Sequence, residues 1–279
     1  MNWVKSLIIA FSMYSKIPMP HLNLEEKDMR YVMGFFPLVG LVLGACQFIW
    51  YKLSAFLGVP NVSRALIFLV LPVIVTGGIH VDGYMDTSDA IHSYGDREKK
   101  LSILKDSHIG AFAVIRLLVY SAVYFAALFW MAEQGKEQAF LLFAGIFYLS
   151  RILSGFAAVN FRGARKNGML YTFTSVTDRY RVNALLGIQF VICLVGMGLV
   201  DIYKTGAVFL AAGLVLCYYR HMAYKEFGGV TGDLAGYFLC VSELCMTVVL
   251  TCVNILYLRA YQFCIACGTK PHLCRIAFM

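Results

Sequence analysis

The chain has 279 residues, of which 60% are hydrophobic and 14% charged, and it carries a formal net charge of +8. A soluble domain of this length would have about a quarter of its residues charged, so the composition excludes an ordinary soluble protein and indicates an integral membrane protein. Basic and aromatic residues are not interleaved on a polar stretch, which argues against a nucleic-acid partner. Anionic membrane lipid and an anionic substrate both remain as partners for the positive charge.

Seven apolar stretches come near the roughly 20 residues that a helix needs to cross a bilayer. In chain order they are 32–51, 64–80, 111–132, 138–160, 182–202, 206–220 and 235–258. The apolar segment before Pro18 predicts either an interfacial helix or an eighth span. We therefore expect an all-α, polytopic membrane helix bundle of about seven transmembrane helices. It forms a single catalytic domain over 1–258, followed by an atypical tail over 259–279.

Lys and Arg are concentrated in alternate connections between these spans. Fifteen of them lie in segments 1–31, 81–110, 161–181 and 220–234, whereas the intervening connections hold Lys52, Lys136 and Lys204, one each. Because basic loops are retained on the cytoplasmic side, the first set is predicted to be cytoplasmic. All the polar motifs described below then share the cytoplasmic face of a prokaryotic inner membrane.

The most informative motif follows the second span and reads His80-Val-Asp-Gly-Tyr-Met-Asp-Thr-Ser-Asp89. Asp82, Asp86 and Asp89 are spaced i, i+4, i+7 and therefore share one helix face. Carboxylates this close repel each other unless a cation lies between them, and oxygen-only ligands favour Mg²⁺ or Mn²⁺. In hydrocarbon each Asp would cost roughly 2.5–3.5 kcal/mol, so the cluster must face water, a cavity or a substrate. His80 is open to three interpretations: metal neighbour, proton carrier or interfacial polar residue.

Two groups of polar residues follow this motif. The stretch Lys105-Asp-Ser-His108 stands just before the third span. Asp106 adds a carboxylate to the metal shell, and Lys105 and His108 can meet phosphate oxygens. In the next cytoplasmic loop Arg162, Arg165 and Lys166 either bind a diphosphate or only reflect the positive-inside bias.

The last polar loop contains Thr231, Gly232 and Asp233. A glycine-rich turn leading into a helix offers backbone N–H groups to an anion, although the same residues also make an ordinary helix start. Inside the span that follows, Glu243 is either a functional acid or the ion-pair partner of Arg116 or Arg151. Most of the nine cysteines lie in apolar spans, and the spacing in the tail from Cys264 to Cys274 favours an unstructured tail over a zinc site.

Taken in order, these motifs resemble the cobalamin synthase family, the adenosylcobinamide-GDP ribazoletransferases, over about residues 11–250. The matching motifs are Lys16-Ile-Pro-Met-Pro20, Phe36-Pro-Leu-Val-Gly40, the long signature from Gly77 to Asp89, Lys105-Asp-Ser-His-Ile-Gly110 and Gly229-Val-Thr-Gly-Asp233. The chain departs from the family in carrying Lys16 where Arg is usual, and in reading Leu234-Ala-Gly236 where Leu-Gly-Ala is usual.

The resemblance implies a magnesium-dependent transferase of a substituted phosphate group. It would join adenosylcobinamide-GDP with α-ribazole, or its 5′-phosphate, to give adenosylcobalamin, or its 5′-phosphate, plus GMP. A homo-oligomer or an association with other cobalamin-assembly enzymes is compatible with it. Our hypothesis assigns roles as follows: Asp82, Asp86 and Asp106 to the metal, Asp89 and His80 to catalysis, Lys105, Arg162 and Arg165 to the diphosphate, and Thr231, Gly232 and Asp233 to closing the site.

Two other classes of protein use acidic residues in a membrane. A CDP-alcohol phosphotransferase also carries a magnesium-binding Asp cluster, but its motif has Ala-Arg where this chain has Asp86 and Thr87. A cation-coupled transporter would use Asp82, Asp86 and Glu243 as an ion path. Transporters commonly place such acids near mid-membrane and contain repeated halves, and the chain shows no internal repeat.

Overall fold

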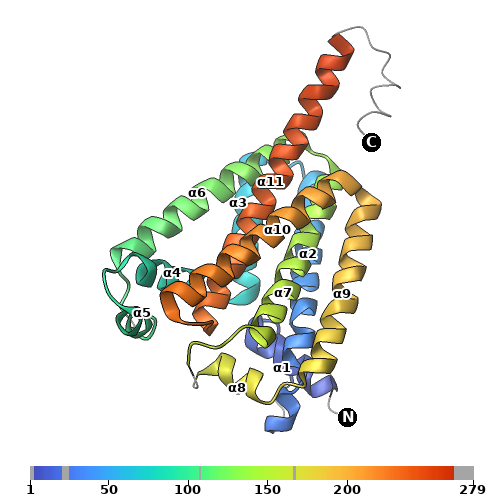
Figure 1. Ribbon diagram of the computed structural model, residues 1–279. Coiled ribbons are helices and arrows are strands. Elements are labelled where there is room, and N and C mark those ends of the chain that lie inside the picture. Colours follow the sequence, from blue (N-terminus) through green and yellow to red (C-terminus); the bar gives the residue numbers. More distant parts are fainter. Residues whose placement is uncertain (1–2, 21–24, 107, 166–167, 267–279) are drawn as a thin grey trace.

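Long apolar helices form the frame of the molecule (Figure 1). In this computed structural model, which describes residues 3–20, 25–106, 108–165 and 168–266, six helices are long and apolar enough to cross a membrane. They are α2 (Val32–Phe56), α6 (Ala111–Gln134), α7 (Glu137–Asn160), α9 (Arg179–Val200), α10 (Ile202–Met222) and α11 (Gly232–Ala266). The described chain contains no strand, which confirms the all-α membrane bundle.

The expected span 64–80 is not continuous. α3 (Asn61–Thr76) ends at Gly77, and after Gly78 the chain continues as α4 (Ile79–His92), bent by 97° from α3. Both glycines have positive φ, 66° and 81°, which side chains strongly disfavour. The side chain of Lys16 also occupies the position that a Cβ at Gly77 would take. α3 is therefore a short seventh apolar helix, and the polar α4 turns away from its path.

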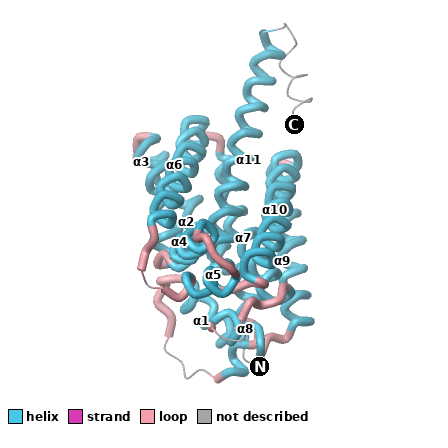
Figure 2. Tube along the Cα trace, turned by 60° about the vertical axis from the view of Figure 1, so that its left-hand side comes forward, coloured by secondary structure: helices cyan, strands magenta, loops and turns pink. Residues whose placement is uncertain are grey.

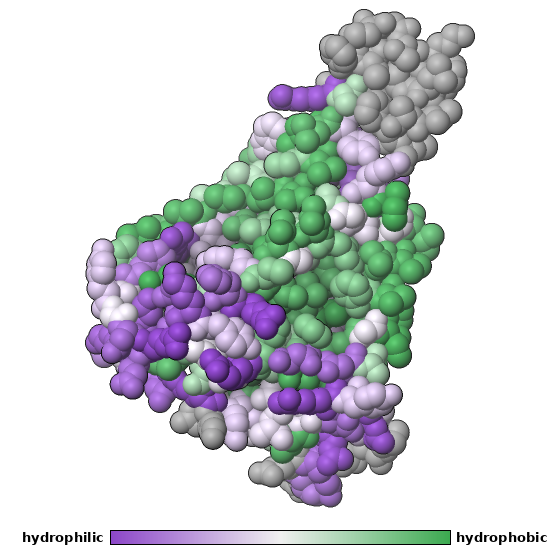
Figure 3. All heavy atoms as spheres, in the orientation of Figure 1, coloured by the Kyte–Doolittle hydropathy of each residue, from purple (hydrophilic) through white to green (hydrophobic). Residues whose placement is uncertain are grey.

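Short elements gather at one end of the bundle. They are α1 (Trp3–Tyr14), η1 (Glu26–Met29), α5 (Arg97–Ile103), α8 (Met169–Ser175) and the π-helical turn η2 (Ala223–Phe227). α1 has 12 residues, about 18 Å at 1.5 Å per residue, which is too short to cross a bilayer and fits the interfacial alternative. Figures 1 and 2 place α1, α5 and α8 away from the end reached by α11, and Figure 3 shows hydrophilic atoms gathered there.

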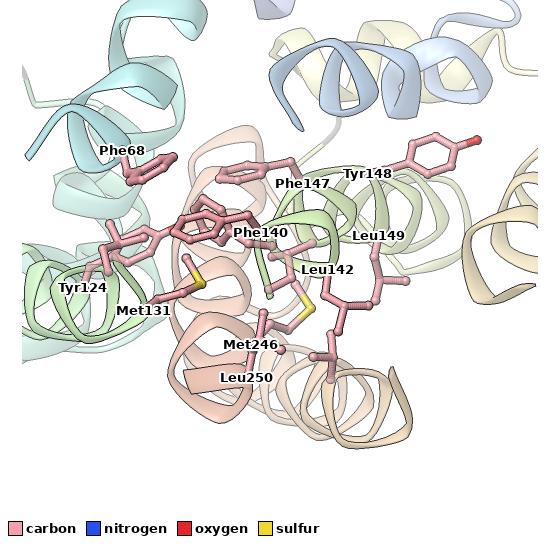
Figure 4. Close-up of a cluster of buried hydrophobic side chains, with 14 of the residues drawn as sticks. Phe68, Tyr124, Met131, Phe140, Leu142, Phe147, Tyr148, Leu149, Met246 and Leu250 are labelled. Carbon is pink, nitrogen blue, oxygen red and sulfur yellow. The ribbon is translucent and has the colours of Figure 1, made fainter. Parts of the chain in front are cut away.

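The core is built around α7, which packs most closely against α2. A Cβ at Gly40 would meet the Phe147 carbonyl and one at Gly44 would meet the Ala144 carbonyl, so the two glycines let the helix backbones touch. Around this contact, rings and aliphatic side chains from α3, α6, α7 and α11 interlock (Figure 4). Lipid tails are as apolar as these side chains, so close packing rather than the hydrophobic effect stabilises the contact.

α11 continues beyond the expected end of the last span at residue 258 and runs to Ala266 (Figure 1). It rises clear of the bundle at the end away from the short elements. The cysteines and the histidine after residue 266 lie outside the described residues.

A buried ion pair joins α7 to α11 in the bundle interior. Arg151 and Glu243, whose side chains are 1% and 6% exposed, contact each other directly, and the Ser150 hydroxyl donates to Glu243 Oε1 at 3.1 Å. Arg151 Nη1 also donates to Ser150 Oγ at 2.9 Å. Of the two partners predicted for Glu243, the structure selects Arg151.

We expect Glu243→Leu to destabilise the protein by about 3–5 kcal/mol, because it leaves the Arg151 guanidinium buried without a counter-charge. The double variant Arg151→Met/Glu243→Leu should recover most of that loss, because it removes both charges while keeping the volume. Unfolding midpoints in detergent micelles would measure these two variants and the single variant Arg151→Met. Simply additive losses in the double variant would contradict this role for the pair.

Candidate functional site

A cavity of about 900 Å³ lies where α4, α7, α8 and α11 meet the loop 161–165. Eight residues predicted for the site line it: His80, Asp82, Lys105, Arg162, Arg165, Thr231, Gly232 and Asp233. These residues come from four separate stretches of sequence. The fold thus brings an acidic helix, a basic loop and a glycine-rich turn together around one space.

The acidic side of the cavity is carried by α4, and the predicted helix is confirmed. Asp82 is exposed and Asp86 and Asp89 are half-buried, while residues on the opposite face of α4 are buried. Burial, together with the negative charges of Asp82, Asp233 and Asp89, raises the pKa of Asp86 to about 6. The carboxylates therefore share a region of negative charge that attracts a cation.

Two glycines bring α4 against α11. A Cβ at Gly83 would lie 2.7 Å from the Asp233 carbonyl oxygen, and one at Gly236 would lie 2.9 Å from the His80 carbonyl oxygen. Helix backbones can approach this closely only where neither residue carries a side chain. The contact sets Asp82 on α4 beside Asp233 on α11. Thr231 starts α11 by accepting the Leu234 N–H at 3.2 Å, so Thr231 acts as a helix cap.

Two backbone hydrogen bonds join the basic loop to the glycine-rich turn. Val230 N donates to the Arg162 carbonyl and Ala164 N donates to the Val230 carbonyl, both at 2.9 Å. Gly229 allows this contact, since a Cβ there would lie 2.6 Å from Ala164 N. The two loops therefore hold the basic residues at a fixed place beside the start of α11.

Both arginines predicted to hold a diphosphate also bind backbone carbonyls. Arg162 donates from Nε and Nη2 to the Gly228 carbonyl at 3.1 and 2.9 Å, and its guanidinium lies over the Tyr224 ring. Arg165 donates to the carbonyl of Leu101 on α5. These contacts orient the two guanidinium groups beside the cavity and leave further N–H groups for an anion.

Three predicted site residues do not line the cavity: Asp86, Asp89 and Asp106. The carboxylate of Asp89 lies where a Gly110 side chain would be. The carboxylate of Asp106 accepts from His108 N at 3.0 Å and contacts His108 Nδ1 at 2.6 Å. These contacts lower the pKa of Asp106. Lys166 lies outside the described residues.

The predicted metal ligands Asp82, Asp86 and Asp106 do not form a preassembled site. Within the described ranges, no three His, Cys, Asp or Glu side chains are grouped so that they could hold an ion between them. The carboxylates nearest the cavity are nevertheless hard oxygen ligands. Mg²⁺ needs only one or two of them when substrate phosphates and waters complete its shell.

Several lining residues escaped the sequence analysis. Arg179 was counted only as part of a basic loop, and Tyr14, Met33, Phe36 and Ala158 looked like ordinary apolar residues of a membrane bundle. Of these, only Phe36 lies in a motif that carries the family resemblance. Its place in that motif is the one sequence feature that could have indicated a role in the site.

The fold and the site define the class as membrane helix bundles with an acidic helix and a basic loop around one cavity. The comparisons with known proteins narrow this class. The family model described as cobalamin-5-phosphate synthase matches residues 6–251. The chain belongs to this family of transferases.

Individual relatives agree with the family match. The chain is similar to the adenosylcobinamide-GDP ribazoletransferase of Lachnoclostridium phytofermentans, with 44% identity over 88% of this chain and 92% of the relative. The enzyme of the same name from Clostridium botulinum is 34% identical over 87% of this chain and 95% of the relative. The one from Pseudomonas fluorescens is 30% identical over 87% and 97%. No solved structure matches the chain.

We expect Gly83→Ala to reduce activity at least tenfold, because the added methyl would push α4 away from the Asp233 backbone and separate Asp82 from Asp233. Gly213→Ala on α10 is the matched control, since a Cβ there meets nothing within 4 Å. Both variants would be purified in detergent and assayed by turnover. Equal activity of the two variants would contradict the importance of the contact.

Proposed function

We propose that this protein is an adenosylcobinamide-GDP ribazoletransferase, joining adenosylcobinamide-GDP to α-ribazole or its 5′-phosphate and releasing GMP. The observation that carries the proposal is one cavity in which Asp82 and Asp233 face the basic residues Lys105, Arg162 and Arg165. Membership of the cobalamin-5-phosphate synthase family and the names of the relatives support the same reaction.

The basic side of the cavity suits the diphosphate of the substrate. Arginine forks match phosphate oxygens in pairs, and Lys105, in the segment between α5 and α6, adds a point charge. Held in this way, the phosphorus attached to cobinamide is exposed to a ribose hydroxyl of ribazole. The new P–O bond forms as the anhydride bond to GMP breaks, and GMP leaves with the electron pair of that bond.

The carboxylates divide between a cation and a proton. Asp82 and Asp86, one helical turn apart, would hold Mg²⁺ or Mn²⁺. Asp106 would join the coordination shell of the metal only if its contacts with His108 were broken. The bound cation would neutralise charge on the diphosphate. Asp89, the base expected from the sequence, faces Gly110, whereas Asp233 lines the cavity. We therefore propose that Asp233, rather than Asp89, is the base that accepts the proton of the attacking ribose hydroxyl.

The membrane orientation is part of the proposal. The cavity lies at the end of the bundle that carries the basic connections, so it faces the cytoplasm of a bacterial cell. Its substrates are cytoplasmic anions. The intramembrane acid Glu243 is paired with Arg151, which leaves the transporter alternative without the ion path it needs.

Membranes holding the wild-type protein should release GMP from adenosylcobinamide-GDP only when α-ribazole or its phosphate is present. Asp82→Asn should lower this rate at least 100-fold, because a neutral amide is a much weaker ligand for the cation that Asp82 would hold. Chromatography of GMP and of the complete corrinoid measures both products. Glu98→Gln, an exposed acid on α5, is the control and should keep wild-type activity.

Chelation should abolish the reaction, and Mg²⁺ or Mn²⁺ should restore it. The physical reason is that the donor set is made only of carboxylate oxygens, which suit hard cations. The measurement is the rate of GMP release after treatment with EDTA and after titration with each metal. Full activity in excess EDTA would remove the metal from the proposal while leaving the transferase activity in place.

A further inference from the structure

The cavity has an apolar side that the proposed phosphate chemistry leaves unused. Met33, Phe36, Ala158 and Val159 line it and are 2%, 3%, 8% and 2% exposed. They come from α2 and α7, whereas the charged lining residues come from α4, α9, α11 and the loops. Tyr14, the last residue of α1, completes this side. A purely anionic ligand would gain nothing from such a surface.

Three rings stand together on the apolar side. The centroids of Tyr14 and Phe36 are 4.4 Å apart, with their planes tilted by 49°. The His80 ring lies 6.3 Å from Tyr14, nearly parallel at 22°, and 6.0 Å from Phe36, edge-on at 68°. Rings at these separations and angles present flat faces and edges that favour another aromatic ring over a flexible chain.

His80 also presents an unsatisfied polar atom. The residue is 8% exposed, it lines the cavity, and its Nε2 is buried with no hydrogen-bond partner among the described residues. Buried nitrogen atoms in proteins are nearly always paired, so an orphan that borders a cavity points to a ligand atom. An acyl chain of membrane lipid offers no such atom, and a heteroaromatic ring nitrogen does.

We propose that this side of the cavity binds the aromatic base of the nucleoside substrate, with the base against Tyr14 and Phe36 and a ring nitrogen accepting a hydrogen bond from His80 Nε2. The assignment rests on the proposed function and adds to it a subsite for the benzimidazole of α-ribazole. The base would then be anchored between α1, α2 and α7, and its ribose would extend toward the carboxylates. Ala158, the smallest residue of the wall, limits the size of the base.

The size limit can be tested with Ala158→Leu, which fills the space beside the rings. We expect KM for α-ribazole to rise about tenfold while KM for adenosylcobinamide-GDP changes less than twofold. The preference for a benzimidazole riboside over a smaller imidazole riboside should fall by a similar factor. Ala126→Leu, the same change at an exposed position of α6, should leave every value unchanged.

The hydrogen bond can be tested with His80→Phe and with the riboside of indole, which lacks the free ring nitrogen of benzimidazole. The wild-type enzyme should prefer the benzimidazole riboside over the indole riboside by about tenfold in kcat/KM. His80→Phe should reduce that preference to near unity. A loss of folding alone would lower both rates together and would leave the ratio as it was.

The outcomes separate the two proposals. If wild-type membranes release no GMP from adenosylcobinamide-GDP and α-ribazole, the proposed function itself fails. If they do, but both variants keep the wild-type base preferences, the transferase activity stands and the base subsite is wrong. Equal increases in both KM values for Ala158→Leu would likewise overturn the subsite, because they would place the diphosphate substrate in the same space.

Discussion

The cost of placing charge in hydrocarbon is the constraint on which this structure depends. The molecule meets that cost in two ways. Most charged side chains lie in the connections at one end of the bundle, beside α4, α5 and α8 (Figure 3). In the bundle interior, the buried charges of Arg151 and Glu243 are paired with each other. The acidic helix can therefore border a membrane only because the bend at Gly77 and Gly78 turns it away from the path of α3.

Glycines allow the close backbone contacts that bring the residues of the site together. Gly83 and Gly236 let α4 touch α11, Gly229 lets one loop lie against another, and Gly40 and Gly44 seat α2 on α7. In each case a backbone atom lies where a side chain would begin. The positions of Asp82, Asp233 and Arg162 thus follow from helix and loop contacts that tolerate almost no added volume, a rigidity that suits a reaction governed by positioning.

The sequence was sufficient for the parts of the fold that depend on local composition. Apolar stretches of membrane length predicted six of the helices, and the spacing of Asp82, Asp86 and Asp89 predicted the face of α4. The expected span runs to residue 80, past the end of α3 at Thr76, because the apolar stretch continues to Ile79. The helix ends because Gly77 and Gly78 adopt positive φ. The side chain of Lys16, from a distant part of the chain, packs directly against Gly77. The sequence also left open whether Arg151 or Arg116 pairs with Glu243, because that depends on how the helices pack against each other.

The residues of the site also fall into those that the sequence predicted and those that only the structure shows. Charged residues and a glycine-rich turn next to apolar spans are conspicuous in a sequence, and eight of the residues predicted from them line the cavity. Tyr14, Met33 and Ala158 were not, because an apolar residue of a binding wall has the same composition signal as one that packs or meets lipid. Only the three-dimensional arrangement shows that these side chains and the unpaired nitrogen of His80 border one space.

The Arg151–Glu243 pair also sets an order of assembly. The two residues are 92 positions apart, so ribosomal synthesis delivers α7 to the membrane well before α11. Until then the guanidinium has no carboxylate, and the earlier helices must shelter it or leave it near water. The later of the two helices, α11, is therefore the one that neutralises the charge of Arg151. A nascent chain that stops before Glu243 is therefore left with an unmatched cation, a defect that membrane quality control can recognise.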